Sequence, residues 1–114
     1  MRLLQGTLDL LVLNALATGA SHGYAVASWI RQTTDERLQI EDGALYTALH
    51  RMEKRGWLEA EWGRTDTNRR ARFYALTPVG RKRLEQDARS WVAYAEAVFA
   101  VLGASGRAPA REGA

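Results

Sequence analysis

The side chains best suited to binding a partner are gathered in one short stretch, residues 41–55. If this stretch is helical, at about 100° per residue, its apolar and polar residues separate onto two faces. The polar face holds Tyr46, Thr47, His50, Arg51 and Lys54. These residues offer hydrogen-bond donors and acceptors, an aromatic ring and two permanent cations, which favours an anionic partner such as a DNA groove. A surface helix that is basic by chance fits the same wheel equally well.

The opposite face of this stretch predicts how the helix is anchored. Leu45, Ala48, Leu49 and Met52 share that face and should pack on a small core. Asp42 is a plausible N-cap, because its carboxylate suits the positive end of a helix. The same acid should lie at the rim of any DNA contact.

Catalytic and metal chemistry find no support in the sequence. The chain has no cysteine and two histidines, so it lacks a thiol nucleophile and a cysteine metal site. We find no serine–histidine–acid set, phosphate loop or metal-ligand cluster with recognisable spacing. Asp9 and Glu53 are interpreted as isolated acids that serve as surface groups or caps. We therefore expect no enzyme, no cofactor and no metal site.

Length and composition indicate one small globular domain. The chain has 114 residues, 46% of them hydrophobic, and a formal net charge of +3. The mild basicity is compatible with nucleic-acid binding. Asp9 and Asn14 interrupt the longest apolar run, which is too short to cross a bilayer. With no leader pattern after Met1, a cytoplasmic protein is expected.

The elements around the central stretch follow from periodicity and capping. Helices are predicted over residues 5–17, over 21–33 with Ser21 as N-cap, and from Pro78 to Leu102 with Thr77 as N-cap. Strands are predicted at 57–62 and 72–76, joined by a long arginine-rich tip at 63–70.

Two apolar surfaces predict a second subunit. The first helix is apolar nearly all round, so a partner should cover Leu10 and Leu13. The last helix carries a heptad seam formed by Leu84, Ala88, Trp91, Ala95, Val98 and Leu102. We favour a dimer through this seam over the alternative that the seam packs on its own domain.

The order helix–helix–helix–hairpin–helix predicts a winged helix-turn-helix, mainly α with a two-stranded β-hairpin, followed by a long dimerisation helix. We divide the chain into a DNA-binding domain at 1–77, a dimerisation helix at 78–102 and a disordered tail at 103–114.

The sequence also resembles the PadR-type transcriptional regulators, in their short form with a single C-terminal helix. The matching blocks are Gly6-Thr7-Leu8-Asp9-Leu10-Leu11-Val12-Leu13, His22-Gly23-Tyr24, Asp42-Gly43-Ala44-Leu45-Tyr46-Thr47-Ala48-Leu49, Asn68-Arg69-Arg70-Ala71-Arg72-Phe73-Tyr74 and Leu76-Thr77-Pro78-Val79-Gly80. The resemblance implies a homodimeric repressor of a roughly palindromic operator, released in some relatives by a small aromatic or apolar effector. It also makes Tyr24 a candidate for phosphate contact, although the wheel allows Tyr24 in the core. The family usually has Ser and Pro where this chain has Ala44 and Thr47, so specificity should differ there.

Each polar residue of the third helix receives an expected role on double-stranded DNA. His50 and Arg51 could address guanine or a phosphate, and Ala44 and Thr47 could meet a thymine methyl. Tyr46 could reach a phosphate or sugar, and Lys54 should find the backbone.

The wing and the last helix carry further expectations. Arg69 and Arg70 should reach phosphates or the adjacent minor groove, and Arg72 and Tyr74 could extend that contact or cover the body of the domain. Trp91 could anchor the dimer or line an apolar effector pocket. A winged helix used only for protein interaction is the main alternative, and RNA binding is a weaker one.

Overall fold

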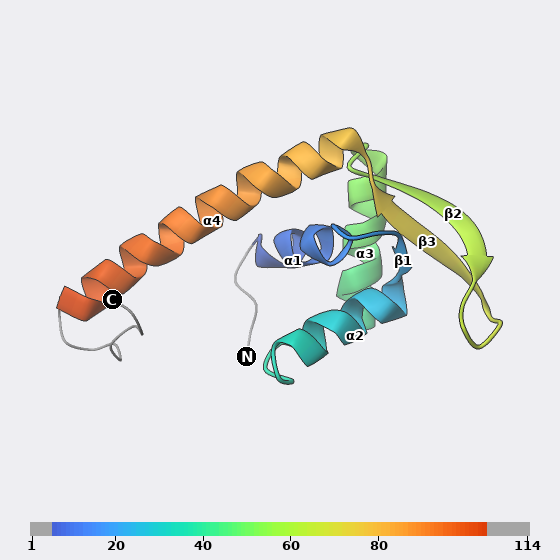
Figure 1. Ribbon diagram of the computed structural model, residues 1–114, viewed down its shortest axis with the longest axis horizontal. Coiled ribbons are helices and arrows are strands. Elements are labelled where there is room, and N and C mark those ends of the chain that lie inside the picture. Colours follow the sequence, from blue (N-terminus) through green and yellow to red (C-terminus); the bar gives the residue numbers. More distant parts are fainter. Residues whose placement is uncertain (1–5, 105–114) are drawn as a thin grey trace. The chain divides into compact units, whose positions relative to one another are not determined.

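The structure, a computed structural model, describes residues 6–104. The elements in chain order are α1 (Thr7–Ala15), β1 (Ser21–His22), α2 (Gly23–Thr33), α3 (Asp42–Lys54), β2 (Leu58–Arg64), β3 (Arg70–Leu76) and α4 (Pro78–Ala104) (Figure 1). The chain divides into two compact units after Leu84, within α4. The first unit holds α1 to α3, the sheet and the first turns of α4, and the second holds the remainder of α4.

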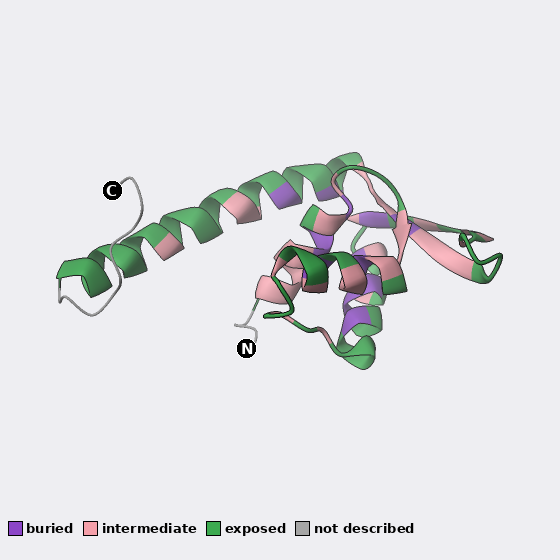
Figure 2. Ribbon diagram, turned by 60° about the horizontal axis from the view of Figure 1, so that its bottom comes forward, coloured by how far each residue is buried: buried purple, intermediate pink, exposed green. Residues whose placement is uncertain are grey.

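The core of the first unit lies among α1, α2, α3 and the sheet (Figure 2). The face of α3 that was predicted to be apolar is buried, with Leu45, Ala48, Leu49 and Met52 each at most 1% exposed. Other members of this core are Val12, Leu13, Leu16, Val26, Ile30, Leu58, Tyr74 and Leu84. Burial of one apolar stripe per helix leaves the opposite face of α3 available to a partner.

The fold is mainly α-helical, as the sequence predicted, but the sheet has a third strand. β1 pairs with β3 in antiparallel register, Ser21 opposite Tyr74 and His22 opposite Phe73, giving the order β1-β3-β2. A strand of two residues has no periodicity to detect, so the hairpin alone was predicted. The N-cap of α2 is His22 rather than Ser21, and its Nδ1 accepts a hydrogen bond from the Ala25 amide at 3.3 Å.

The wing formed by β2 and β3 ends in a short, ordered turn instead of the long tip expected. The strands extend to Arg64 and Arg70, and the Thr65 carbonyl accepts from the Asn68 amide at 2.8 Å. Asn68 has φ 63°, a left-handed conformation that asparagine tolerates well. Arg64, Arg69 and Arg70 therefore lie beside a tight turn whose backbone conformation is held by hydrogen bonds.

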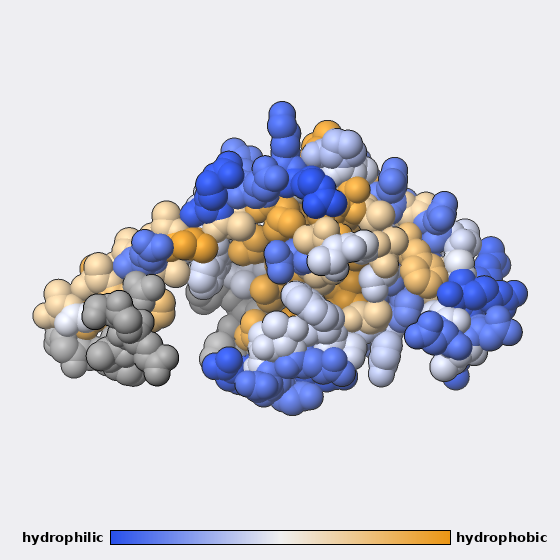
Figure 3. All heavy atoms as spheres, viewed as in Figure 1, coloured by the Kyte–Doolittle hydropathy of each residue, from blue (hydrophilic) through white to orange (hydrophobic). Residues whose placement is uncertain are grey.

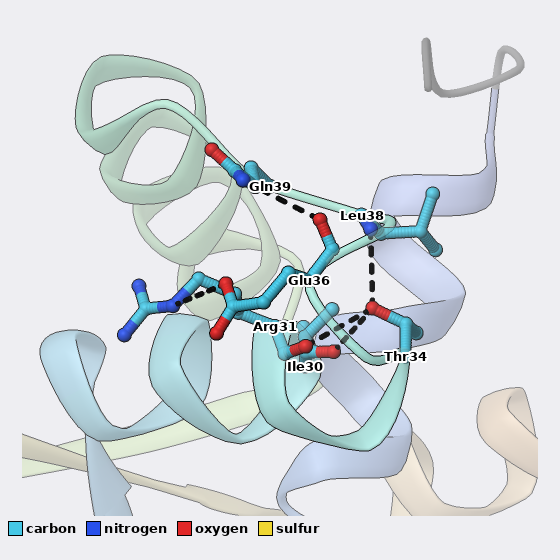
Figure 4. A network of polar contacts seen from close by, with 6 residues as sticks. All are labelled: Ile30, Arg31, Thr34, Glu36, Leu38 and Gln39. Carbon is cyan, nitrogen blue, oxygen red and sulfur yellow. Dashed lines mark hydrogen bonds and ion pairs between the residues drawn. The ribbon is translucent and has the colours of Figure 1, made fainter.

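The connection between α2 and α3 is braced by polar contacts (Figure 4). The Thr34 hydroxyl donates to the Ile30 carbonyl at 2.9 Å and accepts from the Leu38 amide at 3.1 Å. Arg31 and Glu36 form an ion pair at 3.2 Å beside this hydroxyl. These local bonds fix the turn between the two helices. The N-cap of α3 is Glu41, and the predicted cap Asp42 is the first helical residue.

The start of α4 is fastened to the wing. The Thr77 hydroxyl accepts from the Gly80 amide at 3.0 Å, which confirms the predicted N-cap. A Cβ on Gly80 would lie 1.9 Å from the Trp57 carbonyl oxygen. Glycine is required here because the first turn of α4 touches the backbone that precedes β2.

Two residues predicted at a dimer interface belong to the core of the first unit. Leu13 is 0% exposed and Leu84 is 8% exposed. Leu10 is partly buried and packs against the same core. Leu13 and Leu84 are thus covered by their own chain, and the heptad seam loses its first member. The sequence could not distinguish the two cases, because a core position and an interface position are equally apolar.

The described part of the second unit is the remainder of α4, where apolar side chains are exposed. Trp91 and Val98 are each 39% exposed, and Ala88 and Ala95 are half-buried. Gly103 and Ala104, expected in the disordered tail, belong to the last turn of α4. The rest of that predicted tail lies outside the described residues. No helix within residues 6–104 is long and apolar enough to cross a bilayer.

Candidate nucleic-acid interface

The outer face of α3 carries most of the residues expected to bind DNA. Ala44, Tyr46, Thr47, His50 and Lys54 are all exposed, on a helix whose opposite face is buried. No side chain of α3 other than Arg51 and Glu53 has an ion pair within the described part of the chain. The outer face of the helix therefore presents Tyr46, Thr47, His50 and Lys54, with the exposed acid Asp42 in its first turn.

An open hollow of about 1040 Å³ lies between α2, α3 and the wing, all within the first unit. Its lining includes Tyr24, Tyr46 and His50 from the helices and Arg69 and Arg70 from the wing. Figure 3 shows hydrophilic side chains gathered at the tip of the wing. Five of the predicted DNA-binding residues thus border one concave surface. Ala44, Thr47 and Lys54 are exposed on α3 but do not line this hollow.

Tyr46 is positioned by a glycine of α2. A Cβ on Gly23 would lie 2.8 Å from the Tyr46 ring, so the ring packs directly on the first turn of α2. The next residue, Tyr24, is 71% exposed, which removes the alternative that it is a core residue. Gly23 of the His22-Gly23-Tyr24 block therefore leaves room for the Tyr46 ring, and the Tyr24 ring lies at the surface.

Arg51 does not join this surface as the sequence suggested. Its guanidinium donates two hydrogen bonds to the Asp9 carboxylate, at 2.6 and 2.8 Å, and links α3 to α1. The hydrogen bond to Asp9 raises the pKa of Arg51, against the lowering effect of burial. Base contact by Arg51 would require this bidentate ion pair to break. The interpretation of Asp9 as an isolated surface group was wrong.

A second ion pair joins β3 to α3. Arg72 donates to Glu53 at 2.8 Å, so Glu53 is also not an isolated acid. Tyr74, on the same strand face, is 1% exposed, and burial raises the pKa of its phenol. Of the two roles left open for these residues, the structure assigns Arg72 and Tyr74 to holding the wing on the body of the domain.

Two tryptophans at the hollow were not among the expected site residues. Trp29 of α2 is 45% exposed and Trp62 of β2 is 59% exposed, and both line the hollow. The guanidinium carbon of Arg70 lies 4.4 Å from the Trp62 ring centroid. Trp62 lies on the same strand face as buried Leu58, but alternation alone does not reveal where a strand leaves the core. The sequence signal that could have identified Trp62 as a site residue is its place in one strand of the hairpin, across from the arginines of the other strand.

Comparison with known proteins shows which families and structures this chain resembles. Residues 12–86 match the profile of the Transcriptional regulator PadR-like family. The chain is 34% identical over 80 residues to a transcriptional regulator of Mycobacterium tuberculosis, covering 69% of this chain and 70% of that protein. A solved transcriptional regulator from Clostridium thermocellum is 33% identical with a TM-score of 0.75, over 83% of this chain and 92% of its own.

A structure of Bacillus subtilis PadR in complex with operator DNA shares the fold of this chain. The TM-score is 0.63 at 20% identity, and the match covers 70% of this chain and 45% of that one. No group of three or more metal-ligating side chains is assembled within residues 6–104.

Proposed function

Because the chain belongs to the PadR-like family of transcriptional regulators, we propose that it binds duplex DNA through α3 and the wing, as a homodimer. The family is one of regulators and not of enzymes. The observation that carries the proposal is the separation of faces on α3: four apolar residues are buried, and the opposite polar face borders a hollow edged by wing arginines.

In this proposal α3 enters the major groove. Ala44 and Thr47 meet thymine methyl groups, His50 addresses a guanine or a phosphate, and Lys54 reaches the backbone. Arg51 mainly supports the position of α3 and does not contact bases, because its guanidinium is paired with Asp9 of α1. The polar face has no carboxylate at its centre, which favours nucleic acid over a protein partner, since an apolar or mixed-sign face would suit a protein better.

The remaining contacts come from α2 and the wing. Tyr24 and Tyr46 reach phosphates or sugars at the edge of the groove, and Arg69 and Arg70 reach the adjacent backbone or minor groove. All four residues line the hollow. The fold shared with an operator-bound regulator supports this orientation.

Dimerisation is proposed through α4. Ala88, Trp91, Ala95, Val98 and Leu102 repeat at heptad spacing, and an exposed seam of this kind is stabilised by a second helix. Two copies related by a two-fold axis would read two half-sites, so a roughly palindromic operator is expected.

Regulation forms the last part of the proposal. Repression follows from occupying an operator that transcription must cross, and a small aromatic or hydrophobic effector would release the protein. Trp91 is the candidate for lining the effector pocket, since its indole is 39% exposed on the proposed seam. The cytoplasmic location stays a prediction.

Selection of bound duplexes from a random pool tests the central claim. We expect an enriched motif with two inverted half-sites separated by about one helical turn. Enrichment of a single half-site would refute the dimer, and absence of any enriched or bound duplex would refute DNA binding. Competition with a structured RNA in the same gel shift distinguishes duplex DNA from RNA as the preferred partner.

A further inference from the structure

The arginines beside α3 and on the wing differ in what holds them. Arg51 and Arg72 each donate to a carboxylate, Asp9 and Glu53 respectively. Arg70 has no ion pair within residues 6–104, and its guanidinium lies against the indole of Trp62. Arg70 is therefore a cation at the hollow that is not paired with any carboxylate of the described residues.

The strand register explains where this stacked pair lies. Trp62 is opposite Arg72, and Arg64 is opposite Arg70, so Trp62 and Arg70 are diagonal neighbours on one face of the wing. Along β3 this face passes from buried Tyr74, through ion-paired Arg72, to exposed Arg70. The Trp62–Arg70 pair thus begins where the sheet leaves the core, and both residues line the hollow.

Packing against an indole can hold an arginine side chain in place while its N–H groups stay free to bind acceptors in a DNA groove. The ring covers the flat face of the guanidinium, whereas the N–H groups on its edge remain available to acceptors. The contact also restricts a side chain that would otherwise lose much rotamer freedom on binding. Trp62 itself is 59% exposed and so contributes little to the core.

We propose that Trp62 positions Arg70 to detect the width of the minor groove beside the base pairs that α3 contacts. This inference rests on the proposed function, in which the wing meets the duplex. A narrow minor groove in A·T-rich DNA has an enhanced negative potential that attracts an inserted arginine. The protein then prefers A·T-rich flanks at positions where it reads no base edge, and Trp62 is a positioning residue for that preference.

The experiment compares two versions of the duplex selected from the random pool. In one, the base pairs beside each half-site are replaced by an A-tract, and in the other by a G·C run. Fluorescence anisotropy should give tighter binding of wild-type protein to the A-tract duplex by about tenfold, the cost typical of one unfavourable base pair. Arg70→Ala should bring this ratio near one.

Variants of Trp62 test the positioning role. Trp62→Leu keeps an apolar side chain but removes the π-face, and should lower the flank ratio about 2- to 5-fold, the range of an exposed cation–π contact. Trp62→Tyr should retain most of the ratio. The double variant Trp62→Leu with Arg70→Ala should match Arg70→Ala, because Trp62 acts through that arginine.

Arg55 supplies a matched control outside the hollow. Its guanidinium carbon lies 5.3 Å from the Trp57 ring centroid, and neither residue lines the hollow. Arg55→Ala should therefore leave the flank ratio unchanged, with any loss of affinity shared by both duplexes. Circular dichroism verifies that each variant is folded.

Three results would overturn the inference. Equal binding of both flanks by wild-type protein removes the width preference, and an unchanged ratio in Trp62→Leu removes the role of Trp62. A double variant weaker than Arg70→Ala would mean that Trp62 contacts DNA directly. If wild-type protein binds no duplex at all, the proposed function itself fails, and this result is distinct from the other three.

Discussion

The arginines around α3 show how the nearest partner sets the role of a side chain. Asp9 accepts one hydrogen bond from each terminal nitrogen of the Arg51 guanidinium, and Glu53 accepts one from Arg72. Arg70 lies on Trp62 and forms no ion pair with any residue from 6 to 104, and the Arg69 amide donates to the Thr65 hydroxyl at 3.1 Å. Residues of one type therefore divide into two that hold the domain together and two that are offered to a partner.

Arg51 and Asp9 provide a prediction about stability. Arg51→Ala and Asp9→Asn should each lower the free energy of unfolding by about 1 kcal/mol, because both remove a bidentate but partly solvated ion pair between α1 and α3. Urea denaturation measures the change. Arg31→Gln, which breaks the more exposed pair with Glu36, should cost less. If Arg51→Ala were as stable as wild type but lost DNA binding, Arg51 would be a base reader after all.

His50 and Lys54 should separate base reading from backbone contact. His50→Ala is expected to cost about 1–3 kcal/mol on the selected duplex and to relax sequence preference at one position. Lys54→Ala should weaken binding to all duplexes alike and reduce the slope of affinity against salt by about 1. Anisotropy titrations at several salt concentrations distinguish these outcomes. Identical behaviour of the two variants would contradict the assignment.

Among the elements, the wing and the first turn of α4 depend on close backbone contact. The Trp57 carbonyl accepts from the Thr77 amide at 3.1 Å and also lies against Gly80. Arg72 and Glu53 tie the other strand of the wing to α3. These contacts fix the base of the hairpin relative to α3 and the first turn of α4. They therefore also determine the direction in which the hairpin presents its arginines.

Gly80→Ala tests this close approach. The added Cβ has no room beside the Trp57 carbonyl, so we expect a loss of about 1–3 kcal/mol in the free energy of unfolding, as for overpacked sites. Gly43→Ala is the matched control, since Gly43 lies in the first turn of α3 and a Cβ there meets nothing within 4 Å. The control should be neutral or slightly stabilising. Equal melting temperatures for wild type and Gly80→Ala would show that the contact relaxes.

At the scale of the whole molecule, the two units differ in how their apolar residues are covered. The first unit buries a core among three helices and a sheet. The second carries Trp91, Val92 and Val98 with at least 39% of each exposed. Exposed apolar side chains gathered on one helix are typical of an interaction surface, and the heptad spacing favours a second copy of the same helix.

Trp91→Asp combined with Val98→Asp should give a folded monomer. The substitutions leave the core of the first unit intact, but they place two carboxylates in the proposed seam. Sedimentation equilibrium should show monomers, and affinity for the selected palindrome should fall by at least tenfold because the half-sites bind separately. Ala93→Asp with Ala100→Asp adds the same charges at the same spacing off the seam and should remain dimeric. Dimers of the seam variant would refute this interface.

Local patterns in the sequence were sufficient for the faces of α3, the N-cap of α4 and the hairpin, because periodicity and capping act over a few residues. The family was indicated by the resemblance of several motif blocks, and not by these local patterns. Only the tertiary structure showed that Asp9 meets Arg51, 42 positions apart, that β1 joins the sheet, and that Leu13 and Leu84 lie in the core. An arginine that reads DNA and one that holds two helices together are chemically identical. Packing decides between them, because it alone determines which carboxylate or ring each guanidinium meets.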